Sequence, residues 1–379
     1  MSARPRLLIV TAAFGEGHNS AARNLSLALE AAGAETRVSD PCSQSSPLGT
    51  ELVSKGYRYV TTHFPSVWAR IYRSTDQYDF SQPSPPVLDI PERFLDRLIE
   101  EYRPDAVIST FPLYPYFLAR TMEETGKKFP VFTVVTDSIE INASWLKAPT
   151  DFWLVTDSRT RELMAGKGLD AEKIIDLGFP VHPDFSKLTP VSPEDACEPF
   201  RVLYFPTRNS SCIRHHGKAA LETSPDVQLT IVMGKNVRSL HTRAKELQKT
   251  YPGRVKLIGW TRKVPHLLNS HHLVIGKAGG ATVHEAIAAR CPMLIHHLVP
   301  GQEEGNLRLL EAIGAGCLCE TGEALAEKIR DLLADHATKW RAMKQALIRH
   351  DRNSGALTSA RFILDHVSET QDLKTQDAR

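Results

Sequence analysis

The chain has 379 residues, 42% of them hydrophobic, and this length predicts two domains rather than one. A formal net charge of +2 is too small for wholesale nucleic-acid binding, so we expect no nucleic-acid partner. No run approaches the ~20 apolar residues of a transmembrane helix, so any membrane contact should be peripheral. The six cysteines form no C-x-x-C pair and no zinc spacing, which favours reduced thiols and predicts no metal site.

Short apolar runs alternate with helical patterns from the N-terminus onward. In the first half, strands are predicted at 6–11, 106–109, 131–136 and 152–156, with helices at 20–32, 116–125 and from 158. In the second half, strands are predicted at 201–205, 228–233, 255–258, 273–275 and 293–296, with helices at 238–250, 264–269, 282–289, 305–312, after 323 and at 356–368. This alternation is typical of parallel sheets covered by helices on both faces.

A proline-rich stretch at 180–199 interrupts the alternation and suits a linker. We therefore predict an α/β protein with two Rossmann-like domains that face a central cleft. The expected divisions are an N-terminal acceptor and membrane-facing domain (1–185), a linker (186–200), a C-terminal donor-binding domain (201–355), and a C-terminal helix with a disordered tail (356–379) that crosses back to the first domain. Ligands of such sheets bind beyond the carboxyl ends of the strands.

A second irregular stretch is predicted from 41 to 91, and it holds aromatic and basic residues together. Trp68 and Tyr72 lie near helical spacing, with Arg70 and Arg73 beside them. Such a mixture suits the interface of an anionic membrane, which makes these four residues candidates for acceptor and membrane contact. The alternative is a helix whose aromatic side chains face the core and whose arginines are solvated.

The loop after the first predicted strand reads F-G-E-G-H and precedes a helix. Gly15 and Gly17 favour a tight turn and close approach of a ligand. His18 follows them directly, where an imidazole can act as general base on an acceptor hydroxyl. The alternative is a histidine that only caps the helix.

The loop after strand 273–275 is a stronger phosphate-binding candidate. Gly279 and Gly280 precede a helix that begins with Thr282, and backbone N–H groups there can hold a diphosphate without metal. Glu285 lies one turn further, within reach of neighbouring hydroxyls such as those of a ribose. The alternative for Glu285 is a solvated acid that complements the helix dipole.

Two further loops carry polar groups suited to a sugar donor. After strand 293–296, Gln302, Glu303 and Asn306 place amide and carboxylate groups at a helix start, although a polar turn with an ordinary capped helix is the alternative. After strand 201–205, Asn209 and Ser210 can donate hydrogen bonds to a phosphate, in a segment that is also rich in basic residues.

The segments GEGHNSAARNLSLAL and GGATVHEAIAARCPMLIHHLVPGQEEGN, with VVTDSIEINASW and GFPVHPDF between them, resemble the monogalactosyldiacylglycerol synthase and processive diacylglycerol glucosyltransferase family of glycosyltransferase family 28. The resemblance implies a GT-B fold and inversion at the anomeric carbon. It matches His18 to the reaction-centre histidine and Asp137 to an aspartate near the acceptor that orients or assists the base. It further matches Gly279, Gly280 and Thr282 to a phosphate-binding turn and Glu285 to a ribose-binding acid. Gln302 and Glu303 match a pair that contacts the sugar, and Asn306 closes that motif.

The sequence departs from the family pattern on the acceptor side. A histidine usually stands three residues before the tryptophan that corresponds to Trp145, and here that position is Asn142. We keep both residues as acceptor-side candidates.

The sequence therefore predicts an enzyme that transfers galactose or glucose from UDP-galactose or UDP-glucose to a lipid, diacylglycerol before others. The expected location is cytoplasmic, peripheral on the inner face of the cell membrane with an anionic surface, and neither cofactor nor metal is expected. The alternatives are another lipid acceptor such as a polyprenyl-linked one, a UDP-sugar epimerase, and a nucleotide-sugar binding protein without activity.

Overall fold

The structure is a computed structural model that describes residues 4–377 except 14, 76–85, 196, 208–210 and 302. The chain divides into two compact units. The first contains residues 1–183, 300–305 and 354–379, and the second contains 184–299 and 306–353. The first unit therefore takes in both a short internal segment and the C-terminal helix.

The first unit is built on a parallel six-stranded sheet in the order β2-β1-β3-β4-β5-β6. Every residue of β3 and β4 is buried, which explains their uniformly apolar or small sequences. The strands are β1 (Arg6–Val10), β2 (Glu35–Ser39), β3 (Ala106–Ser109), β4 (Val131–Val134), β5 (Phe152–Val155) and β6 (Ile174–Asp176).

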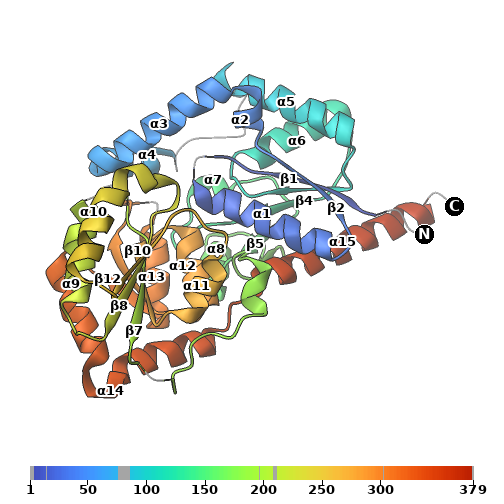
Figure 1. The fold of residues 1–379 in the computed structure, drawn as a ribbon. Coiled ribbons are helices and arrows are strands. Elements are labelled where there is room, and N and C mark those ends of the chain that lie inside the picture. Colours follow the sequence, from blue (N-terminus) through green and yellow to red (C-terminus); the bar gives the residue numbers. More distant parts are fainter. Residues whose placement is uncertain are drawn as a thin grey trace. The chain divides into compact units, whose positions relative to one another are not determined.

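Helices cover both faces of this sheet, and alternate side chains of β1 serve the two faces. Leu7 and Ile9 pack in one cluster with α1 (Glu16–Ala31) and α15 (Gly355–Asp377), which run side by side in Figure 1. Leu8 and Val10 pack in another cluster with α5 (Pro86–Tyr102) and α6 (Tyr114–Thr125). Two further helices, α7 (Ala143–Leu146) and α8 (Ser158–Gly166), follow β4 and β5. The helix α15 continues to Asp377, so the expectation that the C-terminal helix gives way to a disordered tail was wrong for residues up to 377.

The expectation of an irregular stretch from 41 to 91 was also wrong. It contains α2 (Pro41–Ser45), α3 (Pro47–His63), α4 (Pro65–Thr75) and the start of α5. Each of these four helices begins with a proline. Proline is favoured at the first helical position because its fixed φ suits the helix and its missing N–H would have no partner there.

The second unit is built on a second parallel six-stranded sheet, in the order β12-β11-β10-β7-β8-β9. Its strands are β7 (Phe200–Tyr204), β8 (Val227–Val232), β9 (Val255–Ile258), β10 (Leu273–Lys277), β11 (Met293–His297) and β12 (Gly316–Leu318). Its helices are α9 (Lys218–Leu221), α10 (Val237–Thr250), α11 (Val264–Ser270), α12 (Gly280–Ala288), α13 (Glu304–Ile313, which starts in the first unit) and α14 (Gly322–His350), with shorter turns η1 (Pro183–Ser186), η2 (Ile213–Gly217) and η3 (Gly234–Asn236).

The proline-rich stretch before β7 is partly anchored. Val191 is buried in the core of the second unit, and its backbone N–H donates to the Asn269 carbonyl at 2.9 Å. This anchoring limits how freely the segment between residues 186 and 200 can move.

Both sheets reverse their winding direction at one point. In the first sheet β2 lies on one side of β1 and β3 on the other, and in the second sheet β8 and β10 flank β7 in the same way. In open α/β sheets, ligands bind outside the carboxyl ends of the strands at such a switch point. The loops after β1 and β3, and those after β7 and β10, are therefore where sites are expected.

Candidate active site

His18 lies in the first turn of α1, because that helix begins at Glu16 rather than at residue 20. The N-cap is Gly15 and no side chain caps the helix, so His18 is not a capping residue. Gly15 has an extended backbone that any residue can adopt, and Gly17 is inside the helix. Neither glycine has a positive φ, so the expected tight glycine turn is not formed by left-handed backbone.

The His18 ring is held at the switch point of the first sheet by residues that follow β3 and β4. Its Nδ1 lies 2.7 Å from the Thr110 carbonyl oxygen and 3.0 Å from Thr136 Oγ1. A carbonyl only accepts, so Nδ1 carries the proton and donates it. Sequence reasoning did not single out Thr110 or Thr136, because their role depends on which strand ends lie together in space.

The electrostatics of His18 favour the neutral ring. Burial lowers the pKa of its imidazole to about 4, against a smaller opposite effect of the Thr110 hydrogen bond. The ring is therefore neutral near pH 7. With Nδ1–H committed to Thr110, the lone pair is on Nε2, which has no hydrogen-bond partner among the described residues. A neutral imidazole with a free nitrogen is what a general base requires.

Asp137 directly follows Thr136, whose hydroxyl contacts His18, but its own carboxylate has a different partner. Its Oδ2 accepts a hydrogen bond from Trp145 Nε1 at 2.8 Å, and the Trp145 and His18 ring centroids are 6.1 Å apart. Burial raises the pKa of the Asp137 carboxyl to about 6, the Trp145 bond lowers it, and the charge of Glu303 raises it. Thr110 and Thr136 are thus the residues that contact His18 Nδ1, and no hydrogen bond joins Asp137 to His18 among the described residues.

Asn142 is the N-cap of the short helix α7, which carries Trp145. Its Oδ1 accepts from the Ser144 N–H at 2.9 Å and from the Ser144 hydroxyl at 2.7 Å. Its Nδ2 lies 3.4 Å from the Tyr72 carbonyl oxygen. Asn142 and Trp145 are both buried, and their hydrogen bonds fix the start of α7 and the carboxylate of Asp137.

In the second unit, the start of α12 forms a cradle of backbone N–H groups at the carboxyl end of β10. Gly279 is its N-cap without a side-chain cap, and the Val283 N–H is the first to bond within the helix, to the Gly279 carbonyl at 3.0 Å. The N–H groups of Gly280, Ala281 and Thr282 are therefore left for an anion by helix geometry. Thr282 and Glu285 are both half-buried within the first turns of α12.

Asn306 braces this cradle from α13. Its Nδ2 donates to the Ala278 carbonyl at 3.0 Å, directly before the two glycines. The residue is 3% exposed, and its Oδ1 is buried without a hydrogen-bond partner in the described part of the chain. Asn306 therefore positions the turn and offers one unused acceptor beside it.

Of the remaining candidates for binding the sugar donor, the structure describes only Glu303. Asn209, Ser210 and Gln302 lie outside the described residues. Glu303 is buried in the segment 300–305, which clusters with the first unit. In that segment Gly305 lies so close to the backbone at Ser138 that an added Cβ would be 1.9 Å from the Ser138 carbonyl oxygen.

The membrane candidates on α4 divide by exposure. Trp68 and Tyr72 are half-buried, with Trp68 packed edge-on against Tyr57 at a ring-centroid distance of 4.8 Å, while Arg70 and Arg73 are exposed. The apolar exposure comes from other residues of α3, α4 and the single residue between them: Leu48, Leu52, Val53, Tyr59, Phe64, Val67 and Ile71. We call these seven side chains the α3–α4 apolar surface. Within the described residues, no helix is sufficiently long and apolar to span a bilayer.

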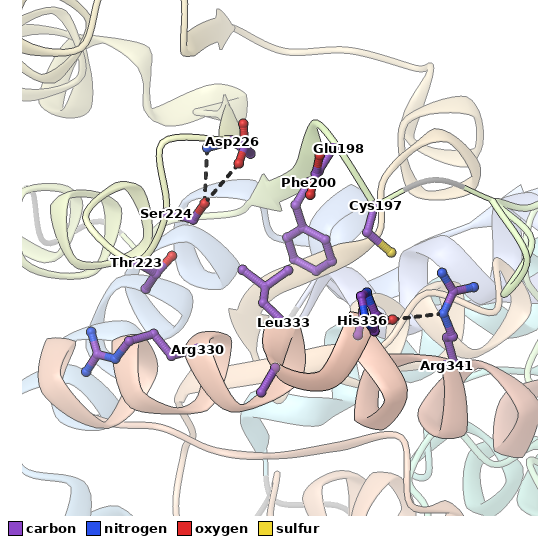
Figure 2. Close-up of a pocket in the computed structure, with 12 residues that line it drawn as sticks. Cys197, Glu198, Phe200, Thr223, Ser224, Asp226, Arg330, Leu333, His336 and Arg341 are labelled. Atoms are coloured by element: carbon purple, nitrogen blue, oxygen red, sulfur yellow. Dashed lines mark hydrogen bonds between the residues drawn. The ribbon is translucent and has the colours of Figure 1, made fainter.

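One hollow of the second unit lies away from these loops. It has a volume of about 540 Å³ and is bordered by Phe200, Asp226 and α14 residues such as Leu333 and Arg341 (Figure 2). Phe200 begins β7 and Asp226 precedes β8, so the hollow is at the amino ends of the strands. It contains none of the residues singled out from the sequence.

Comparison with known proteins identifies the class of enzyme. Residues 209–357 match the model of the glycosyltransferase family 28 C-terminal domain, which makes the chain a glycosyltransferase of the GT-B class. Residues 18–181 match the model of monogalactosyldiacylglycerol (MGDG) synthase. The first part of the chain is thus similar to MGDG synthase, and the second part is similar to the C-terminal domain of glycosyltransferase family 28.

A curated relative and two solved structures resemble the whole chain. The processive diacylglycerol beta-glucosyltransferase of Bacillus pumilus is 26% identical over 100% of this chain and 98% of its own length. MurG of Acinetobacter baumannii aligns with a TM-score of 0.62 at 15% identity, over 96% of this chain and 100% of its own. Anabaena Alr3699/HepE, solved with UDP and glucose, aligns with a TM-score of 0.55 at 14% identity, over 97% of this chain and 100% of its own. At these identities, the two alignments show that the chain shares the fold of the two solved structures.

Proposed function

We propose that this protein is an inverting glycosyltransferase that moves glucose or galactose from a UDP-sugar to a lipid hydroxyl, that of diacylglycerol before other lipids. The observation that carries the proposal is the neutral His18, with Nδ1–H held by Thr110 and Nε2 left as a free base. The relative from Bacillus pumilus, whose name gives diacylglycerol and a beta-glucosyl product, supports the substrate class.

The reaction is a single displacement. His18 Nε2 takes the proton of the acceptor hydroxyl while that oxygen attacks the anomeric carbon of the sugar. The bond from this carbon to the β-phosphate oxygen breaks, and UDP leaves with the bonding electrons. A UDP-sugar with an α-linkage then gives a β-glycoside.

The second unit holds the donor in this proposal. The N–H groups of Gly280, Ala281 and Thr282 stabilise the charge that develops on the departing diphosphate, which is a preorganised electrostatic contribution. Glu285 accepts hydrogen bonds from the ribose hydroxyls, and Gln302 and Glu303 contact the hexose. Asn306 keeps the glycine turn in place through Ala278.

Asp137 accepts a hydrogen bond from the acceptor or from the incoming sugar in this proposal. A carboxylate oriented by Trp145 at 2.8 Å presents its other oxygen in a fixed direction. The raised pKa of about 6 means that its charge changes close to neutral pH, so its contribution depends on pH.

The α3–α4 apolar surface contacts the membrane from which the lipid acceptor is taken. Leu48 and Leu52 of α3 are 83% and 72% exposed, and such exposure of large aliphatic side chains marks an interaction surface. Arg70 and Arg73 lie exposed on the same helix pair and suit anionic lipid headgroups. Peripheral binding at the inner face of the cell membrane follows from this proposal.

The test is incubation with radiolabelled UDP-glucose or UDP-galactose, with and without diacylglycerol in anionic micelles, followed by chromatography of the lipid. The proposal predicts a labelled glycolipid that forms only with acceptor, with a β-linkage by NMR. Interconversion of the two UDP-sugars without acceptor would support an epimerase instead. Binding of UDP without any turnover on diacylglycerol or polyprenyl lipids would contradict the proposal.

A further inference from the structure

A cysteine and two histidines lie together in the second unit, and the reaction proposed above does not use them. Cys212 directly precedes the π-helical turn η2, His216 is within that turn, and His296 is on β11. Each of the three offers a ligand atom, a thiol sulfur or a ring nitrogen, and these atoms all lie within 4.8 Å of one another. The two imidazole rings are tilted by 47° with centroids 4.9 Å apart.

Both histidines are buried, and each has its Nε2 turned to a backbone carbonyl. His216 is 6% exposed, and its Nε2 lies 2.9 Å from the Glu320 carbonyl oxygen, while its Nδ1 lies 3.3 Å from the Cys212 carbonyl oxygen, a longer contact that metal binding would replace. His296 is 4% exposed, and its Nε2 lies 3.5 Å from the Phe205 carbonyl oxygen. A carbonyl at Nε2 fixes the proton there and leaves the lone pair on Nδ1. Histidines that bind metals are oriented by such contacts almost without exception.

Two buried polar atoms at this cluster have no hydrogen-bond partner among the described residues. One is Nδ1 of His296, and the other is the hydroxyl of Tyr204, whose ring meets that of His296 edge-on at 5.6 Å. A buried polar atom without a partner is costly, at roughly 1–3 kcal/mol. A ligand that accepts the Nδ1 lone pair would remove that cost for His296.

We propose that Cys212, His216 and His296 bind a zinc ion that links the segment after β7 to β11. One thiolate and two neutral imidazoles form a donor set that zinc prefers. With Zn–S of ~2.3 Å and Zn–N of ~2.0 Å, tetrahedral ligands lie about 3.5 Å apart. Since the ligand atoms lie within 4.8 Å of one another, each pair needs to approach by at most ~1.3 Å, which rotation of the side chains can supply. A water or the Tyr204 hydroxyl completes the fourth position.

An entry path to this site exists in the second unit. A hollow of about 740 Å³ is bordered by Cys212 and His216 together with the start of α14. Cys212 is half-buried at its edge, so a hydrated ion can reach the thiol before the histidines displace its water.

The ion has a structural role in this account. In the second sheet β10 lies between β7 and β11, and the donor cradle follows β10. A link from the segment after β7 to β11 therefore spans β10, the strand that precedes Gly279, and fixes the segments on either side of it. This consequence rests on the proposed function, whereas zinc binding itself does not.

The test is zinc content by mass spectrometry after chelation, reloading and gel filtration of the full chain, with cobalt(II) as a spectroscopic probe. We expect one zinc per chain. With cobalt(II) we expect a thiolate-to-metal charge-transfer band and d–d bands of the intensity that tetrahedral sites give. Cys212→Ser and His296→Gln should each weaken binding by more than the ~10–100-fold that loss of an outer-shell partner costs. His215→Gln and His297→Gln, which change the neighbouring histidines, should retain one zinc.

A second measurement uses the unaltered protein, so that misfolding of a variant cannot decide the result. Zinc should slow alkylation of Cys212, followed by peptide mass spectrometry, while alkylation of the half-buried Cys197 stays unchanged. Absence of bound zinc at micromolar concentrations, or zinc that persists in Cys212→Ser, would overturn the proposal. The cluster would then be a thiol–imidazole hydrogen-bond network, and its alkylation rate would not respond to zinc.

Discussion

Replacing Asp137 by asparagine should stabilise the first unit and impair the enzyme at the same time. The pKa of this carboxyl is raised from 3.8 to about 6, chiefly by burial. Between these two values the folded chain binds more protons than the unfolded chain, so stability falls as pH rises. Above about pH 6 the folded state carries the full cost of the buried charge, and below about pH 4 both states are protonated and the cost is gone.

The size of the effect follows from the same two values. Their difference, at ~1.4 kcal/mol per pH unit, gives about 3 kcal/mol as an upper figure for the gain in Asp137→Asn above pH 7. The asparagine oxygen can still accept the Trp145 hydrogen bond, while the amide NH2 that replaces the second carboxylate oxygen needs an acceptor of its own, which is why about 3 kcal/mol is an upper figure. The gain should vanish near pH 4.

The assay is urea unfolding of wild type and Asp137→Asn at several pH values, with fluorescence as the readout. Glu172→Gln, at an exposed acid, controls for the loss of one negative charge. A variant that is less stable than wild type at pH 8, or a difference that does not change with pH, would refute the reasoning. Turnover of Asp137→Asn should fall even where its stability rises.

Three further predictions concern the donor cradle, the segment 300–305 and the membrane. Glu285→Ala should weaken UDP binding by ~10–100-fold, as expected for a lost hydrogen bond to a charged group, but leave pyrophosphate binding unchanged in calorimetry; an equal loss for both would contradict a ribose contact. Gly305→Ala should cost ~1–3 kcal/mol in thermal unfolding, because its Cβ would meet the Ser138 carbonyl at 1.9 Å, whereas Gly166→Ala, with nothing within 4 Å, should be nearly neutral. Leu48→Asp with Leu52→Asp should lower sedimentation with anionic vesicles and leave UDP binding intact; unchanged sedimentation would exclude the α3–α4 apolar surface.

The central strands could be predicted because they are buried on both faces and read as apolar runs. Three strands were missed: β2, β6 and β12. All three are edge strands of three to five residues, and β2 is mostly exposed, so none of them forms a long apolar run. Local sequence carries little signal for such strands, because their pairing is set by the neighbouring strand.

The stretch from 41 to 91 was misjudged because its prolines were taken as breaks. Pro47, Pro65 and Pro86 instead stand at the first positions of α3, α4 and α5. A proline ends one helix and begins the next by the same restriction of φ. The sequence pattern alone does not distinguish a break from a start.

The candidate site was predicted in part. His18 and Asp137 could be named from motif and resemblance, but the groups that set the protonation of His18 could not. Thr110 and Thr136 come from loops after two other strands, and only the sheet order brings them to the ring. The cluster of Cys212, His216 and His296 could not be predicted either. His296 is 80 residues from His216 in the sequence, so the three residues form no recognisable zinc spacing.

The central claim is that His18 takes the proton of a lipid hydroxyl as a sugar leaves UDP. The most direct measurement is acceptor-dependent UDP release by wild type and His18→Gln at pH 7.5, with UDP affinity measured in parallel. The account predicts that turnover falls by about 10²–10⁴-fold while UDP affinity is unchanged. Full turnover in His18→Gln, or a loss of UDP binding equal to the loss of turnover, would contradict it.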